Sequence, residues 1–316
     1  MPFRVTGMRI LVTGGAGYIG SVLVPELLKA GHKVRVLDSL IYDQNPLLLY
    51  FIDENFEFIK GDIRDHEAVK KAVAGVDIII HLAAIVGAPA CKRNSRLAEE
   101  VNYGGTMNIV NARTGSQKLF FASTGSVYGK IDGICMEDIP TNPLSEYGVT
   151  KLKAEQAVMG AGNSIVYRFA TAFGLAPRLR LDLLPNDFVA SALKHKYLVV
   201  YDKDFKRTFV HVRDIVRAYI FGIEHFDAMK DEVYNIGSER MNKTKEEIAN
   251  LVREKVPCDI YFAAKGIPDP DQRDYEVSYR KIAKHGFDTE ISFDKGIQEL
   301  IDGLKAMPTH EAFSNV

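Results

Sequence analysis

The segment that most constrains the fold is residues 8–38, MRILVTGGAGYIGSVLVPELLKAGHKVRVLD. An apolar run at 10–12 leads into a turn with four glycines, and a helical pattern of apolar residues follows it. Glycines let the backbone turn tightly and approach a pyrophosphate, and the free N–H groups at the start of the helix attract its negative charge. The segment therefore predicts a strand, a phosphate-binding turn and a helix.

A carboxylate closes the next predicted strand. Residues 33–37 form an apolar-rich run that ends at Asp38, eighteen residues after Gly20. A carboxylate at this place accepts hydrogen bonds from the ribose diol of adenosine and repels a 2′-phosphate, which favours NAD over NADP. Glycines by themselves are more often ordinary turn chemistry, but here the strand before them, the helix after them and the acid are all present.

Strands and helices alternate over the first half of the chain. Further strands are expected at 56–59, 77–82, 118–122 and 165–168, with a short helix at 45–52 and longer ones at 65–73, 97–113 and 145–159. This alternation predicts a parallel sheet covered on both faces, and right-handed crossovers give the strand order 3-2-1-4-5-6. The expected class is α/β: a Rossmann-type doubly wound parallel sheet with a smaller C-terminal α/β substrate-binding portion.

The pattern loosens from about residue 170. The segment 206–226 restores a short strand and an amphipathic helix, and a strand end follows at VYNIGS. A helix at 245–255, a strand at 259–262 and two final helices complete the chain. We expect an NAD-binding domain over 1–169 and a substrate-binding portion over 170–316, with elements of about 208–237 returning to the first sheet. Residues 1–7 are interpreted as a short extension.

Composition limits the partners. The 316 residues carry a formal net charge of −1, so no general field recruits nucleic acid or an anionic membrane, and neither partner is expected. No apolar run approaches the ~18 residues needed to span a bilayer. Three cysteines, Cys91, Cys135 and Cys258, lie far apart, without a CxxC pair or a histidine cluster. They indicate free thiols in a reducing cytoplasm and no metal site.

A tyrosine and a lysine carry the expected chemistry. Tyr147 and Lys151 are four residues apart, which places them on one face of a helix. A phenol with a pKa near ~10 is a poor base, but a nearby ammonium and a positive nicotinamide ring favour its phenolate. Thr124, at the end of the fifth strand, can hydrogen-bond the same substrate hydroxyl. Such pairs also occur by chance, so the prediction depends on the dinucleotide turn and on the order Thr, Tyr, Lys.

These motifs resemble those of a known superfamily. The glycine spacing G-x-x-G-x-x-G and YxxxK with an upstream Ser/Thr are similar to the short-chain dehydrogenases/reductases, and TGGAGYIG resembles their extended branch, which modifies nucleotide sugars. GDIRD, HLAA, FASTGSVYG, RTFVHVRD and YNIGS extend the match over most of the chain. The segments VGAPACKRN, RLRLDLLPNDF and DPDQRDY look like a subgroup with GDP-heptose 4-dehydrogenases and uncharacterised epimerases.

The resemblance implies ligands and contacts. The expected ligands are NAD and a UDP- or GDP-linked sugar, with Arg207 and Arg273 on the sugar nucleotide's diphosphate. The expected NAD contacts are Gly14, Gly17, Tyr18, Ile19, Asp38, Asp62, Ile63, Leu82, Ala83, Ala84, Asn102, Tyr147 and Lys151. The expected substrate contacts are Lys92, Arg93, Thr124, Ser126, Arg178, Arg180, Asp182, Asn186, Arg207 and Arg273. Family members also pair the helices near 97–113 and 145–159 between two subunits, which implies a homodimer.

Two departures from the family pattern narrow the reaction. Gly125 and Ser126 stand where 4,6-dehydratases carry an Asp-Glu pair, and decarboxylases have Glu at the place of Ser126. Neither residue can do that acid–base work, so elimination is disfavoured. The leading hypothesis is a nucleotide-sugar 4-epimerase that oxidises carbon 4 transiently. The alternatives are a 4-dehydrogenase that releases a keto sugar, GDP-heptose included, and a non-catalytic NAD-sensing protein, against which Thr124, Tyr147 and Lys151 argue.

Overall fold

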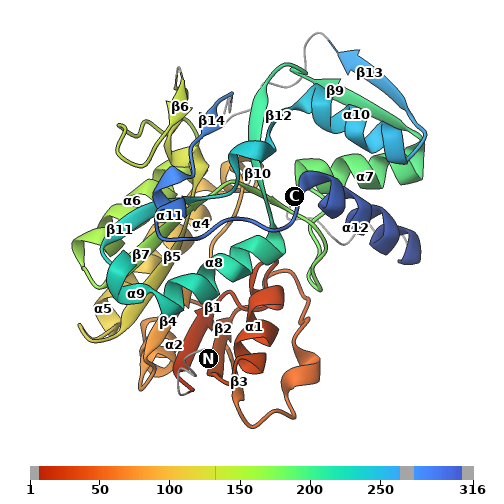
Figure 1. Cartoon of the computed structure of the whole chain (residues 1–316). Coiled ribbons are helices and arrows are strands. Elements are labelled where there is room, and N and C mark those ends of the chain that lie inside the picture. The colour runs from red at the N-terminus through yellow and green to blue at the C-terminus, as the bar shows by residue number, and fades with distance from the viewer. Residues whose placement is uncertain (1–6, 132, 264–273, 308–316) are drawn as a thin grey trace.

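The computed structural model describes residues 7–131, 133–263 and 274–307. In these ranges a seven-stranded parallel sheet has the order β3-β2-β1-β4-β5-β7-β11, shown in Figure 1. Its strands are β1 (Arg9–Thr13), β2 (Lys33–Asp38), β3 (Phe56–Lys60), β4 (Ile78–His81), β5 (Lys118–Thr124), β7 (Ser164–Phe169) and β11 (Glu232–Ile236). The predicted order of the first six strands and the α/β class are confirmed, and β11 adds a seventh strand beside β7.

Helices cover both faces of the sheet because its central strands are apolar throughout. The runs 10–12 and 78–80 are fully buried, as expected for parallel strands packed on both sides. One face packs against α1 (Gly20–Lys29) and α8 (Val212–Glu224). The other packs against α2 (His66–Val73), α5 (Thr106–Ala112) and α6 (Glu146–Gly160). This arrangement leaves the carboxyl ends of the strands as the edge where ligands can enter.

The helix predicted at 97–113 is interrupted. The structure shows α4 (Ser95–Glu99), one π-helical stretch at Glu100–Gly105, and then α5. A Cβ at Gly105 would lie 2.4 Å from the Ile63 side chain, so the chain passes very close to the end of β3 here. The short helix expected at 45–52 is a single 3₁₀ turn at Leu48–Tyr50.

Three smaller sheets lie outside the central sheet in the described residues, and the C-terminal portion has a third apolar core. In the described residues, β12-β10-β8 form a three-stranded sheet, while β9-β13 and β6-β14 are parallel pairs. The strands are β6 (Ile134–Cys135), β8 (Thr171–Phe173), β9 (Tyr197–Tyr201), β10 (Lys206–His211), β12 (Asn242–Thr244), β13 (Asp259–Ala263) and β14 (Glu276–Val277). The described α-helices not yet named are α3 (Ala88–Arg93) in the first half of the chain and, after residue 170, α7 (Leu184–His195), α9 (Phe226–Met229), α10 (Lys245–Lys255), α11 (Arg280–Ala283) and α12 (Phe293–Ala306). The core that joins α7, α10 and α12 lies at the upper right of Figure 1.

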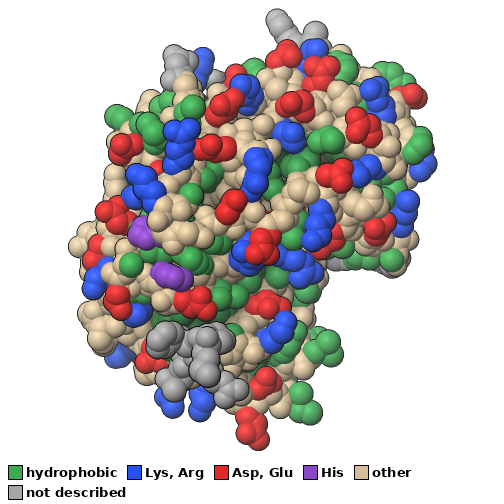
Figure 2. All heavy atoms as spheres, viewed as in Figure 1, with side chains coloured by type: hydrophobic (Ala, Val, Ile, Leu, Met, Phe, Trp, Pro, Cys, Tyr) green, Lys and Arg blue, Asp and Glu red, His purple; other side chains and the backbone are tan. Residues whose placement is uncertain are grey.

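The surface carries charges of both signs. On the face shown in Figure 2, acidic and basic side chains are interspersed, and neither sign dominates it. This agrees with the formal net charge of −1. Among the helices described, none has the length and apolar character that crossing a membrane requires.

A buried histidine at the carboxyl end of β4 predicts that the stability of the fold depends on pH. His81 Nδ1 lies 2.6 Å from Thr13 Oγ1 and Nε2 lies 3.0 Å from Thr106 Oγ1. Burial, aided by the charge of Lys151, lowers the pKa of His81 to about 3, so the folded protein keeps it neutral while the unfolded chain takes up a proton below pH ~6.5. Its contribution to stability is therefore complete above that pH and is lost as the pH falls toward 3.

As the pH falls from ~6.5 toward 3, we expect His81 to lower the free energy of unfolding by up to about 1.4 kcal/mol per pH unit. Urea unfolding between pH 7 and pH 4 measures the slope, and His81→Gln, which does not titrate, is expected to show a shallower one. Parallel slopes for the two proteins would contradict the assignment.

Candidate active site

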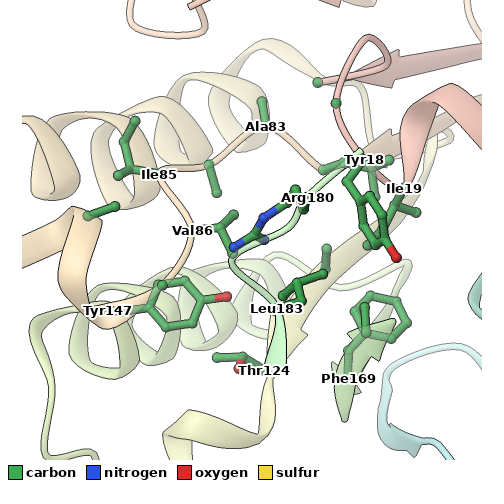
Figure 3. A pocket seen from close by; sticks show the side chains of 18 of the residues that line it. Tyr18, Ile19, Ala83, Ile85, Val86, Thr124, Tyr147, Phe169, Arg180 and Leu183 are labelled. Atoms are coloured by element: carbon green, nitrogen blue, oxygen red, sulfur yellow. The ribbon is translucent and has the colours of Figure 1, made fainter. Parts of the chain in front are cut away.

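A cavity of about 490 Å³ opens at the carboxyl ends of the parallel strands. Its walls come from the glycine turn, from the ends of β2, β4, β5 and β7, and from the loop between β8 and α7. Figure 3 shows side chains from these elements facing one another across it. The residues that the sequence assigned to a ligand and that line this cavity are Gly14, Gly17, Tyr18, Ile19, Asp38, Asp62, Ile63, Leu82, Ala83, Ala84, Thr124, Ser126, Tyr147, Lys151, Arg178, Arg180, Asp182 and Arg207.

The glycine turn has no space for side chains. Gly14 has φ +71°, and a Cβ there would lie 2.7 Å from the backbone nitrogen of Ala83. A Cβ at Gly20 would lie 2.5 Å from Gly15. The turn therefore brings bare backbone to the start of α1, where N–H groups and the helix dipole favour a phosphate. This cradle fits the diphosphate of a dinucleotide.

Asp38 ties the end of β2 to the glycine turn. Its carboxylate accepts hydrogen bonds from the backbone N–H of Ala16 at 2.9 Å and of Leu40 at 2.8 Å. Burial raises the pKa of Asp38, while these two hydrogen bonds and the charge of Arg178 oppose the rise. Because each carboxylate oxygen has two lone pairs, the group can still accept a ribose diol.

The Tyr147 hydroxyl is directed into the cavity. In Figure 3 it points from α6 into the space bounded by Val86, Thr124 and Leu183. Ser145 begins the helix by accepting a hydrogen bond from the Gly148 N–H, which places Tyr147 in the first turn. The Thr124 hydroxyl accepts from the Ser126 N–H at 3.2 Å and can donate its own proton to a ligand.

Lys151 lies one turn further along α6 and is 3% exposed. Its ammonium sits 4.0 Å from the ring centre of Phe121, a cation–π contact. Burial lowers the pKa of Lys151 to about 7, although the Glu155 carboxylate favours the charged form. A lysine held near its titration point can donate or accept a proton at neutral pH.

A buried ion pair lies behind these residues. Glu155 accepts from Ser123 Oγ at 2.5 Å and from Arg168 Nη2 at 2.6 Å, and both charged side chains are nearly fully buried. The ion pair joins α6 to β7, and the hydrogen bond from Ser123, the residue before Thr124, joins α6 to β5. Sequence reasoning missed Glu155, although Tyr147, Lys151 and Glu155 follow one another at intervals of four, which was a usable signal.

Positively charged side chains from the loop between β8 and α7, from β10 and from α10 also line the cavity. Arg180 forms an ion pair with Asp182, Arg207 on β10 is 5% exposed, and Lys245 begins α10. Lys245, Tyr42 and Tyr275 were not predicted, because no local pattern distinguishes them. The Tyr275 hydroxyl would lie 3.1 Å from a Cβ at Gly125, so it occupies space beside the end of β5.

Four predicted contacts that the structure describes do not line the cavity. Lys92 and Arg93 are exposed on α3. Asn102 is buried, where its amide group bonds the backbone of Ile85 at 2.7 and 3.0 Å and so holds the loop after β4. Asn186 is buried too and holds the backbone of Gly174 and Arg180. Arg273 lies outside the described residues.

Comparisons with known proteins agree with this geometry. The model of the NAD dependent epimerase/dehydratase family matches residues 10–237. Putative UDP-glucose 4-epimerase of Methanocaldococcus jannaschii is 28% identical over 94% of this chain and 98% of its own length. UDP-N-acetyl-alpha-D-glucosaminuronate decarboxylase of Bacillus cytotoxicus is 30% identical, over 94% and 98%.

Among solved structures, UDP-glucuronic acid 4-epimerase from Bacillus cereus, in complex with UDP-glucuronic acid and NAD, superposes with a TM-score of 0.86 at 26% identity, covering 95% of this chain and 99% of that one. The glycine turn, Asp38 and the arrangement of Thr124, Tyr147 and Lys151 in this chain agree with that family. This chain therefore belongs to the NAD-dependent epimerase/dehydratase family, as an enzyme of the extended short-chain dehydrogenase/reductase type with NAD as its cofactor.

Proposed function

We propose that the protein is a nucleotide-sugar 4-epimerase that oxidises carbon 4 of the sugar transiently. The observation that supports it best is the Tyr147 hydroxyl, directed into the cavity from the same helix face as the buried Lys151 and close to the end of β5. Tyr147 takes the proton of the 4-hydroxyl, and Thr124 hydrogen-bonds the same oxygen. When NAD is bound, it accepts hydride from carbon 4 and returns it.

Lys151 makes the tyrosine acidic enough to act. A positive charge near the phenol favours its phenolate, which brings the proton affinity of Tyr147 closer to that needed at neutral pH. Glu155 and the Phe121 ring favour the charged form of Lys151, while burial opposes it. Burial is the largest of these effects and leaves the pKa of Lys151 at about 7, so part of the molecules carry this charge at neutral pH.

The end of β5 favours epimerisation over elimination. Gly125 and Ser126 supply no carboxylate beside Thr124, and the Tyr275 hydroxyl fills the space that a side chain at position 125 would need. Positions 125 and 126 therefore offer a 4-keto sugar formed here no acid–base pair that could expel water from carbons 5 and 6. The remaining outcomes are reduction on the opposite face, which is epimerisation, or release.

The basic end of the cavity supports a diphosphate-linked substrate. A guanidinium matches phosphate oxygens in a bidentate manner, and Arg207 and Lys245 reach the cavity from the starts of β10 and α10, in the C-terminal portion. The similar Bacillus cereus enzyme binds UDP-glucuronic acid, so a UDP-sugar is the first substrate to test, and a GDP-sugar is the second.

The test is to incubate the full chain with UDP-glucose, UDP-glucuronic acid and a GDP-sugar, each carrying deuterium at carbon 4. We expect one of them to yield its 4-epimer with the deuterium retained and with no lasting absorbance of reduced nicotinamide. A keto sugar released with a persistent rise in that absorbance would instead establish a 4-dehydrogenase. Absence of turnover with every sugar, together with tight NAD binding, would favour a non-catalytic sensor.

A further inference from the structure

We propose that Arg178, which the sequence assigns to the sugar nucleotide, binds the diphosphate of the NAD cofactor from the loop between β8 and α7. This inference rests on the cofactor of the family and not on the proposed reaction. It makes the loop between β8 and α7 part of the cofactor site.

The loop is held against the cofactor end of the cavity. The Arg178 backbone N–H donates to Ser21 Oγ at 3.3 Å, in the first turn of α1. The Tyr18 hydroxyl, from the glycine turn, donates to the Gly174 carbonyl at 2.6 Å. Arg178 therefore lies beside the helix end at which a dinucleotide diphosphate binds.

The guanidinium of Arg178 has unused donors. The residue is 2% exposed and lines the cavity, and its Nε and Nη2 atoms are buried and have no hydrogen-bond partner among the residues that the structure describes. Its Cζ lies 4.2 Å from the ring centre of Tyr42. Stacking uses the face of the guanidinium, while hydrogen bonds lie in its plane, so the ring leaves those donors available to an anion.

The acids nearby have other partners. Asp38 accepts from the backbone N–H groups of Ala16 and Leu40, and Asp182 pairs with Arg180. A buried cation without a hydrogen-bonded anion is costly, and burial accordingly lowers the pKa of Arg178. An incoming anion would supply the missing acceptors.

The position of Arg178 selects among the anions. Asp38 lies close enough to act on its charge and would repel a 2′-phosphate, which leaves the diphosphate that NAD and NADP share. The diphosphate of the sugar nucleotide is expected at the other end of the cavity, near Arg207 and Lys245. Arg180, two residues along the same loop, points toward Tyr147 and Val86 in Figure 3.

The test compares binding of NAD, NADP and UDP by titration calorimetry of the full chain freed of nucleotide. For Arg178→Met we expect the Kd of NAD and that of NADP to rise by the same factor, about tenfold to a hundredfold, and the Kd of UDP to stay unchanged. Arg178→Lys, which keeps the charge without the fork, should fall between. Arg240→Met removes an exposed arginine, 71% exposed, and should change none of them.

A weakened Kd for UDP with NAD unaffected would return Arg178 to the sugar nucleotide, and a change confined to NADP would indicate the 2′-phosphate. Thermal unfolding without nucleotide separates binding from folding. Because the variant removes unpaired buried donors, nucleotide-free Arg178→Met should be at least as stable as the wild type, and NAD should raise its Tm less. A nucleotide-free variant that is clearly less stable, with a normal response to NAD, would show a merely structural role.

Discussion

Replacing Tyr147 with phenylalanine is expected to lower kcat of epimerisation by about 10²- to 10⁴-fold, the usual size of a general acid–base contribution. The ring keeps its packing in the apolar core beneath α6, so the fold and the affinity for NAD should change little. The loss falls on kcat because the missing hydroxyl is needed to take the proton from the substrate, not to hold it.

Turnover of the active nucleotide sugar and calorimetric titration of NAD measure the two effects separately. Tyr103→Phe is the matched control, since Tyr103 is half-buried in the π-helical stretch and does not line the cavity. Unchanged kcat in Tyr147→Phe would mean that another group moves the proton, and the proposed reaction would lose its base.

Replacing Glu155 with glutamine is expected to reduce the free energy of unfolding by about 3–5 kcal/mol, because it leaves the Arg168 charge buried without its partner. The two side chains are 4% and 6% exposed, so solvent does not screen their interaction. Urea unfolding at neutral pH gives the value.

The matched control is Glu99→Gln, which breaks a pair with Lys153 whose side chains are 43% and 49% exposed. Exposed pairs contribute up to about 1 kcal/mol, so this variant should be much less affected. Removing both charges, as Glu155→Gln with Arg168→Met, should recover part of the loss, since no unpaired ion then remains. Equal destabilisation by the two single variants would show that the buried pair has no special role.

The two variants also differ in their expected effect on catalysis. Tyr147→Phe removes the acid–base group itself. Glu155→Gln acts on the position of Ser123 and on the charge state of Lys151, because Glu155 touches one and favours the charged form of the other. A pH profile of kcat whose alkaline limb moves to lower pH in Glu155→Gln, because Lys151 loses its proton earlier, would identify this positioning effect, which stability alone does not report.

The central sheet was predictable because its information is local. The glycine turn, the apolar strands at 10–12 and 78–80, and the helical periodicity between them each depend on neighbours in the chain. The rules for right-handed crossovers then gave the correct order of six strands. Asp38 and the pair Tyr147 and Lys151 were located in the same way, since a strand end and a four-residue spacing are sequence features.

Elements after residue 170 were harder to predict. The helix α7 begins with Leu184 and Pro185 in a segment without clear period, and β8, with three residues, is too short for alternation to show. Their positions depend on packing against α10 and α12, which lie far along the chain. Local propensity was weak here, and tertiary contacts decided the structure.

By itself, the sequence determined the doubly wound sheet, the dinucleotide turn and the tyrosine–lysine pair. Only the tertiary structure decided which further charged and polar residues face the cavity. It brings Lys245 to the wall, leaves Lys92 and Arg93 exposed on α3, and turns the Asn102 side chain toward the backbone of the loop after β4. Periodicity records which side of a helix or strand is buried. The position of a loop side chain in the folded protein depends on contacts between distant segments, and no short stretch of sequence contains these contacts.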